Sequence, residues 1–172
     1  MQKNFSYPLA IDDISVAEKE YKLRADKTQC QQIAEILKVP EVKMFEGTIY
    51  THRHNKSTLI DVWGKVHALI TRQSVISLEY FDKNYNSEFS LQFDISLTEN
   101  QVRQMEDDGV PNIPEVIIGG QIDLCHLAME QIALELEDHP RQEGEVFSFK
   151  SEFDTENDVK QNPFQILEKL KK

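Results

Sequence analysis

Stretches in which apolar and polar residues alternate recur along the sequence, and their order constrains the fold more than any other feature. The clearest stretches are residues 5–11, 20–25, 42–53, 58–70 and 89–95. A period of two places every second side chain on the same face of a sheet. One helical pattern follows the second stretch and another follows the last, which is not the regular strand–helix alternation of a parallel sheet. The sequence therefore predicts an α+β fold with a mainly antiparallel sheet, and it leaves open whether that sheet curls into a partial barrel.

Two segments with helical spacing are expected to cover the sheet. In the first, Asp26 or Thr28 caps a helix that stops before Pro40. The second spans residues 122–136 and is the most apolar part of the chain, with apolar side chains on more than one side. The polar and acid-rich residues 98–113 are expected to form a loop, with at most one helical turn.

The length of the chain suits one domain with a hydrophobic core, followed by a tail. We expect the domain to span residues 1–143. Residues 144–172 are expected to form a mobile acidic tail that ends in a short helix.

The charge of the chain is acidic and uneven. A formal net charge of −11 disfavours broad RNA binding, because contact with phosphate backbones depends on Lys and Arg. Residues 135–158 contain nine acidic and two basic residues, a net charge of −7 that favours a basic protein partner. Residues 50–72 contain four basic residues and one acidic residue, a net charge of +3. Weak RNA contact is therefore predicted at Arg53, Lys56, Trp63, Lys65 and Arg72.

Trp63 and the neighbouring Gly64 lie in the middle of a predicted strand. Core packing is the favoured interpretation of Trp63, and stacking on an RNA base is the alternative. Glycine inside a strand marks a bulge or a close backbone approach.

Three features of the sequence predict the cellular compartment of the protein. The first residues resemble neither an export signal nor a transit peptide. No apolar run approaches the roughly 20 residues that span a bilayer. Cys30 and Cys125 are expected to be buried thiols rather than a disulfide. We therefore expect a soluble, cytoplasmic protein.

His52 and His54 are two residues apart, so both imidazoles lie on one face of a strand and could bind a metal. They flank a polar hairpin tip at residues 55–57, and no H-E-x-x-H helix accompanies them. A solvated turn is favoured over a metal site, and an RNA or protein contact is a third interpretation. Nucleotide-binding and nucleophile motifs do not occur, so we expect no enzymatic activity, no cofactor and no metal.

Asp123, His126 and Glu130 lie along one stripe of the second helix. Asp123 also stands where a helix cap belongs, so a cap with a solvated face is favoured over a functional stripe. As candidate partner-binding residues we name Asp123, His126, Glu130 and Arg141.

Three blocks of the sequence are similar to the YceD-like family of large ribosomal RNA subunit accumulation proteins, also called domain-of-unknown-function family 177. The first is FSYPL at residues 5–9, and the second is residues 62–79, where a basic or polar run leads into a Leu-Glu pair. The third is Gly120-Gln121-Ile122-Asp123-Leu124 with Glu130, Leu134 and Pro140. Many members carry a cysteine where this chain has Ser74, so the second block is interpreted as a structural strand or a contact surface.

The resemblance implies an accessory factor that is required for accumulation of large-subunit rRNA and has no established enzymatic activity or cofactor. Combined with the charge, it predicts that the chain binds a ribosomal protein or an rRNA-processing factor of the large subunit. Two alternatives stay open. One is a metal-dependent hydrolase or nuclease that uses His52 and His54, and the other is a general scaffold or chaperone-like protein with an indirect effect on rRNA.

Overall fold

The structure, a computed structural model, describes residues 4–146 of the chain. The chain divides into two compact units, Met1–Gln142 and Glu143–Lys172. All helices and strands named below belong to the first unit. The short helix predicted at the end of the acidic tail lies outside the described residues.

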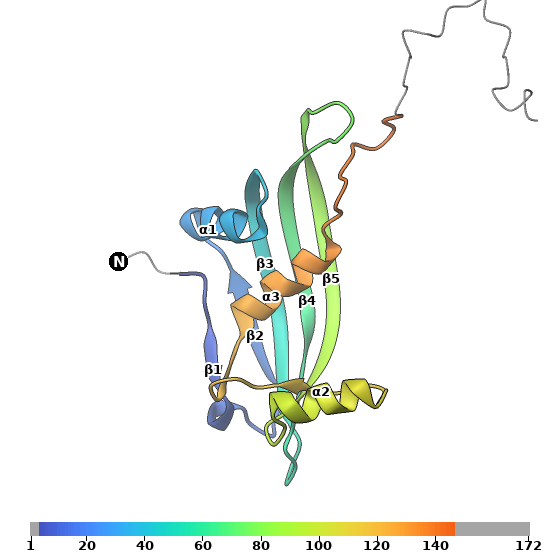
Figure 1. The fold of residues 1–172 in the computed structure, drawn as a ribbon. Helices are drawn as coiled ribbons and strands as arrows, with labels where there is room; N and C mark the ends of the chain where they lie inside the picture. The colour runs from blue at the N-terminus through green and yellow to red at the C-terminus, as the bar shows by residue number, and fades with distance from the viewer. Residues whose placement is uncertain (1–3, 147–172) are drawn as a thin grey trace, which may run out of the picture. The chain divides into compact units, whose positions relative to one another are not determined.

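An open sheet of five strands forms the centre of the first unit (Figure 1). In spatial order the strands are β2 (Lys19–Arg24), β3 (Glu41–Arg53), β4 (Leu59–Gln73), β5 (Tyr80–Asp94) and β6 (Glu115–Val116). Strands β2 to β5 pair antiparallel, whereas β6 pairs parallel with the end of β5. The predicted α+β fold with a mainly antiparallel sheet is confirmed, and the sheet does not close into a barrel.

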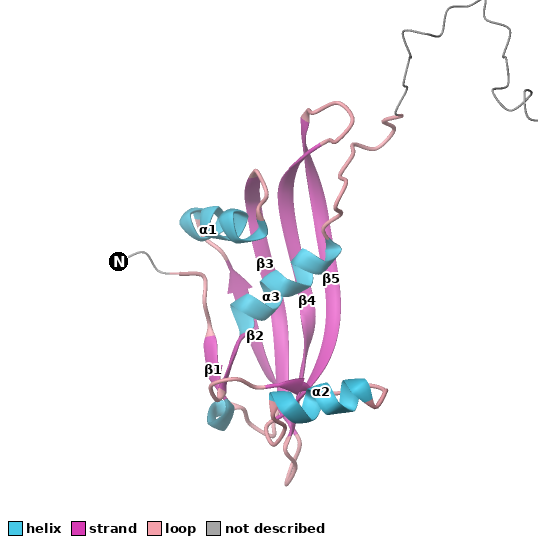
Figure 2. Ribbon diagram, viewed as in Figure 1, coloured by secondary structure: helices cyan, strands magenta, loops and turns pink. Residues whose placement is uncertain are grey.

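Two helices cover one face of this sheet, as predicted (Figure 2). They are α1 (Lys27–Leu37) and α3 (Leu124–Glu135). Asp26 caps α1, because its side chain accepts a hydrogen bond from the backbone N–H of Gln29. In return, the Gln29 side chain accepts one from the backbone N–H of Asp26. Helix α3 follows directly on strand β7 (Gln121–Asp123), which pairs with β1 (Pro8–Ala10). A short 3₁₀ turn, Ile11–Asp13, connects β1 to the rest of the chain.

The hydrophobic core lies between α1, α3 and one face of the sheet, which we call the inner face. Alternate residues of β4 point into it, and both helices contribute buried apolar side chains. Each fully buried aliphatic side chain stabilises the fold by about 1.5 to 3 kcal/mol. The opposite, outer face bears the residues that alternate with these core positions, on β4 Asp61, Trp63, Lys65 and His67. Neither α1 nor α3 covers the outer face.

One predicted loop is wrong, because residues 98–113 contain a helix. Helix α2 (Glu99–Asp107) begins with a capping box formed by Thr98 and Gln101. The breaker signals that suggested a loop, Gly109 and the proline after Val110, come only after the helix has ended. Within the described residues, no helix, α2 included, has the length and apolar character needed to cross a membrane.

Strand β5 begins at Tyr80, earlier than the alternation from Phe89 onward predicts. The early part of β5 places Lys83 and Ser87 on the inner face, and these polar residues hide the alternation. The structure satisfies both at the C-terminal end of α3, where Lys83 forms an ion pair with Glu137 and the Ser87 hydroxyl donates to Glu135. Tertiary contacts therefore create an inner position that polarity alone does not reveal.

Gly64 marks a close backbone approach and not a bulge. A Cβ atom at Gly64 would lie 2.4 Å from the Thr48 carbonyl oxygen on the neighbouring strand. The register shift between β3 and β4 lies elsewhere, between Val42 and Met44. Glycine is needed at this position because no side chain fits between the two strands.

Candidate binding site

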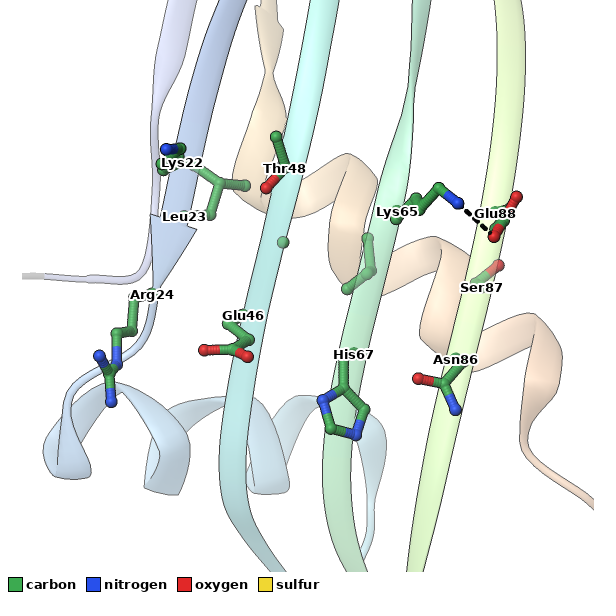
Figure 3. A pocket seen from close by; sticks show the side chains of 12 residues that line it. Lys22, Leu23, Arg24, Glu46, Thr48, Lys65, His67, Asn86, Ser87 and Glu88 are labelled. Carbon is green, nitrogen blue, oxygen red and sulfur yellow. Dashed lines mark hydrogen bonds and ion pairs between the residues drawn. The ribbon is translucent and has the colours of Figure 1, made fainter.

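The outer face of the sheet contains a hollow of about 550 Å³ in front of the middle strands (Figure 3). Two rows of side chains cross it from β2 to β5. The register of the strands gives the rows as Lys22–Thr48–Lys65–Glu88 and Arg24–Glu46–His67–Asn86. In Figure 3 the helices lie behind the sheet, so the hollow opens on the uncovered side.

The hollow contains charged side chains of both signs, and its two lysines form solvent-exposed ion pairs. Lys65 forms an ion pair with Glu88 at 2.6 Å, and Lys22 forms one with Glu20 at 3.1 Å. All four side chains are well exposed, and ion pairs of this kind contribute about 0 to 1 kcal/mol each. Such charges can exchange their partners for those of another molecule at little cost. The hollow therefore suits a polar partner surface.

Trp63 lies beside this hollow, which contradicts the interpretation that it packs in the core. Its neighbours Val62 and Gly64 face inward, so the alternation of the strand turns the indole outward. There Trp63 is half-buried and stacks on Tyr50 of β3, with ring centroids 5.7 Å apart. A second hollow of about 580 Å³ lies next to it and is lined by Trp63, Asp61 and the loop before β6. Stacking of a base on Trp63 stays a prediction.

The structure does not bring the predicted RNA-contact residues together. Lys65 and Trp63 lie on the outer face, whereas Arg53 and Lys56 lie at the β3–β4 turn. Arg72 lies near the opposite end of β4 and faces inward, where its guanidinium donates a hydrogen bond of 2.7 Å to the Glu137 carbonyl oxygen. The basic segment of the sequence is thus spread over both faces and both ends of the sheet.

His52 and His54 are close to each other, as their spacing predicts, with ring centroids 5.2 Å apart. His54 forms a 2.7 Å contact from its Nε2 to Asp61, whose other carboxylate oxygen accepts from Gln92. Burial acts to raise the pKa of Asp61, but these contacts and the nearby imidazoles outweigh it and hold the pKa below its usual value. Among residues 4–146, no group of three or more His, Cys, Asp or Glu side chains that could hold a metal occurs.

Asp123 is the cap of α3 and also ties the N-terminal segment to that helix. Its Oδ1 accepts hydrogen bonds from the amides of Cys125, His126 and Tyr7, and its Oδ2 accepts one from the Ser6 hydroxyl. Burial acts to raise the pKa of Asp123, but the four hydrogen bonds outweigh it and lower the pKa. The structure thus places Asp123 in a structural role.

The other candidate partner-binding residues are on the surface. His126 and Glu130 are exposed on α3 and lie 3.2 Å apart as an i, i+4 pair. Arg141 is exposed and directly follows the buried Pro140. These three residues are accessible to a partner, and their role in binding stays a prediction.

Residues 74–79, which connect β4 to β5, form an ordered loop that we call the end loop. Ser74 is 1 % exposed, and its hydroxyl accepts hydrogen bonds from the amides of Ile76 and Ser77. The Val75 amide donates to the carbonyl oxygen of Pro140, after α3, at 2.9 Å. Ser74 therefore organises the loop from inside.

The loop carries the exposed apolar side chains of Val75 and Leu78, and exposed Tyr80 adjoins it, although no pattern named above predicted this surface. One signal could have found them. Turns between strands are usually polar, whereas this turn contains the apolar residues Val75, Ile76 and Leu78.

Comparison with protein-family models, curated proteins and solved structures finds no match to this chain. The YceD-like resemblance therefore depends on the three sequence blocks. Two of those blocks meet in the structure, because Val75 belongs to the second and Pro140 to the third.

Proposed function

We propose that this protein is a non-enzymatic accessory factor in the biogenesis of the large ribosomal subunit and acts by binding a basic protein partner. One observation supports a binding role above the others. The outer face of the sheet is not covered by α1 or α3, and it contains a hollow that extends across four strands. The resemblance to the YceD-like family supports the assignment of this binding role to the large subunit.

Charge favours a protein over RNA as the main partner. The outer hollow pairs its lysines with carboxylates, and the five predicted RNA-contact residues, all within the described part of the chain, lie at different places and not on one continuous surface. A net charge of −11 repels a phosphate backbone and attracts a basic protein. On the described part of residues 135–158, Glu135 and Asp138 are exposed, so they are available to such a protein.

Affinity purification of the tagged full chain from its native host tests this proposal. We expect a ribosomal protein, a large-subunit precursor or an rRNA-processing factor to be enriched relative to an unrelated protein of similar size and net charge. Binding between opposite charges weakens as salt is raised, so enrichment should fall at high ionic strength. It should survive ribonuclease treatment, because RNA is not the main partner. Recovery of none of these components would contradict the proposal, and recovery of many unrelated proteins would favour a general chaperone-like binder.

A further inference from the structure

The end loop lies at one end of the β4–β5 hairpin (Figure 1). It carries the exposed apolar side chains of Val75 and Leu78, and exposed Tyr80 follows it at the start of β5. Val75 is 52 % exposed, Leu78 is 67 % exposed and Tyr80 is 65 % exposed. We propose that this surface is a docking site that inserts Leu78, with Val75 and Tyr80 beside it, into an apolar pocket of a basic partner protein. The basic character of the partner rests on the proposed function, whereas the docking site itself rests on the geometry of the loop.

The loop is ordered before any partner binds. The Ser74 amide donates to the Glu79 carbonyl oxygen at 2.9 Å, and the Leu78 amide donates to the Ser74 carbonyl oxygen at 3.0 Å. The Gln73 side chain closes the loop by donating to the Leu78 carbonyl oxygen at 2.9 Å. A surface that is already ordered loses little conformational entropy on binding, so its apolar contacts translate efficiently into affinity.

Leu78 adopts a backbone conformation that leucine normally avoids. Its φ angle is 62°, in the left-handed region where glycine and asparagine are the usual residues. The two hydrogen bonds of its backbone hold it there although its side chain is mostly in water. Strain of this kind is concentrated at functional sites. A large apolar residue held outward in a strained conformation indicates that the side chain itself is used.

The shape and charge of the surroundings define the partner. The loop protrudes from the end of a hairpin, so the partner must supply the concave surface. Exposed Glu79 lies within the loop, and exposed Asp138 and Arg141 flank Pro140, whose carbonyl oxygen accepts a hydrogen bond from the loop. Exposed Glu41 and Asp82 lie at the same end of the sheet, where Lys43 pairs with Asp82. Four acids against two bases, on a chain with a net charge of −11, favour a pocket with a basic rim. The same net charge makes a second copy of this chain a poor occupant, because the copies repel each other.

Photo-crosslinking in the native host tests the site directly. The photoreactive residue p-benzoylphenylalanine replaces Tyr80 in the full chain, and the same replacement at Tyr7, which is 44 % exposed on another part of the unit, is the control position. We expect one discrete adduct with a basic protein from position 80 and none from position 7. In the position-80 chain, L78N should lower the adduct yield about tenfold, as expected for loss of a central apolar anchor.

Two variants separate docking from folding. Asparagine tolerates the left-handed conformation, so L78N should melt at or above the wild-type temperature. L134N removes another exposed leucine, which is 79 % exposed on α3, and should leave the adduct yield unchanged. No adduct, an adduct with RNA or with a second copy, or a yield that L78N does not change would overturn the docking site.

The outcomes also distinguish this inference from the proposed function. A basic partner with no connection to the large subunit would support the docking site and contradict the proposed function. Recovery of large-subunit components by affinity purification, together with no adduct from position 80, would support the proposed function and overturn the docking site.

Discussion

Replacement of Asp123 tests whether this residue stabilises the fold, as its hydrogen bonds indicate, or serves partner binding. Alanine at position 123 removes the acceptor of four donors at once. Loss of the cap of α3 costs about 1 kcal/mol. Hydrogen bonds to a charged group contribute about 1.5 to 3 kcal/mol each when they are shielded from water. Because Ser6 and Tyr7 are exposed, their two bonds to Asp123 should contribute about 1 kcal/mol each. We therefore expect D123A to lower the free energy of unfolding by about 3 kcal/mol, adding these contributions.

Asparagine at position 123 should cost much less. Three of the four donors bind Oδ1, which asparagine retains as its carbonyl oxygen, and asparagine is as good a helix cap as aspartate. Only the bond from Ser6 to Oδ2 must reverse direction. We expect D123N to lose about 1 kcal/mol, the contribution of one hydrogen bond.

The pH dependence of stability provides a second readout. The folded pKa of Asp123 is lower than its usual value of 3.8, so ionised Asp123 stabilises the fold. This stabilisation is fully present above the unfolded pKa and is lost as the pH falls through the folded pKa. The difference in stability between wild type and D123N should therefore be constant from pH 7 to about 5 and should narrow as the pH falls further.

Urea denaturation followed by circular dichroism measures these differences. E130A is the matched control, because Glu130 is an exposed carboxylate on the same helix that bonds only His126 in the described residues, and it should change stability by less than about 0.5 kcal/mol. If D123A and E130A were equally mild, the structural role of Asp123 would be refuted.

Three further predictions concern the sheet and the end loop. G64A should lower the free energy of unfolding by about 2 to 3 kcal/mol, since its Cβ would meet the Thr48 carbonyl oxygen, and a loss below about 1 kcal/mol in urea denaturation would contradict this close approach. S74A should cost about 1 to 3 kcal/mol and should speed hydrogen exchange at the two amides that bond the hydroxyl; unchanged exchange would show that the serine does not order the loop. Weak RNA binding, measured by gel shift, should fall in K65E, and the stability of this variant should not change. R72E should instead lower the melting temperature. Loss of RNA binding in R72E but not in K65E would show that the inward-facing arginine and not the outer face contacts RNA.

The period-two pattern predicted the sheet because it reports directly which side chains are buried. The predictions failed where polar residues occupy inner positions. Lys83 and Ser87 hide the first part of β5, since their partners at and just after the C-terminal end of α3 are distant in sequence. Helix α2 was missed for a related reason. Most of its residues are polar, so no apolar stripe marks it as a helix. Gly109 and the proline after Val110 favoured a loop over the whole segment, although both come after the helix has ended.

The candidate site was less predictable than the fold. Counting charges along a segment groups Arg72 with Lys65, but alternation along the strand sends them to opposite faces. The same alternation turns Trp63 outward, against the preference of tryptophan for the core. The end loop needed three-dimensional information, because the contact between Val75 and Pro140 and the backbone angle of Leu78 have no local signature in the sequence.

Depletion of the protein from its native host, followed by separation of ribosomal particles and measurement of rRNA precursors, tests the central claim most directly. If the protein is an accessory factor for the large subunit, depletion should lower the ratio of large to small subunits and cause large-subunit rRNA precursors to accumulate. Expression of the wild-type chain should restore both. Unchanged subunit ratios and precursor levels after complete depletion would contradict the proposed function.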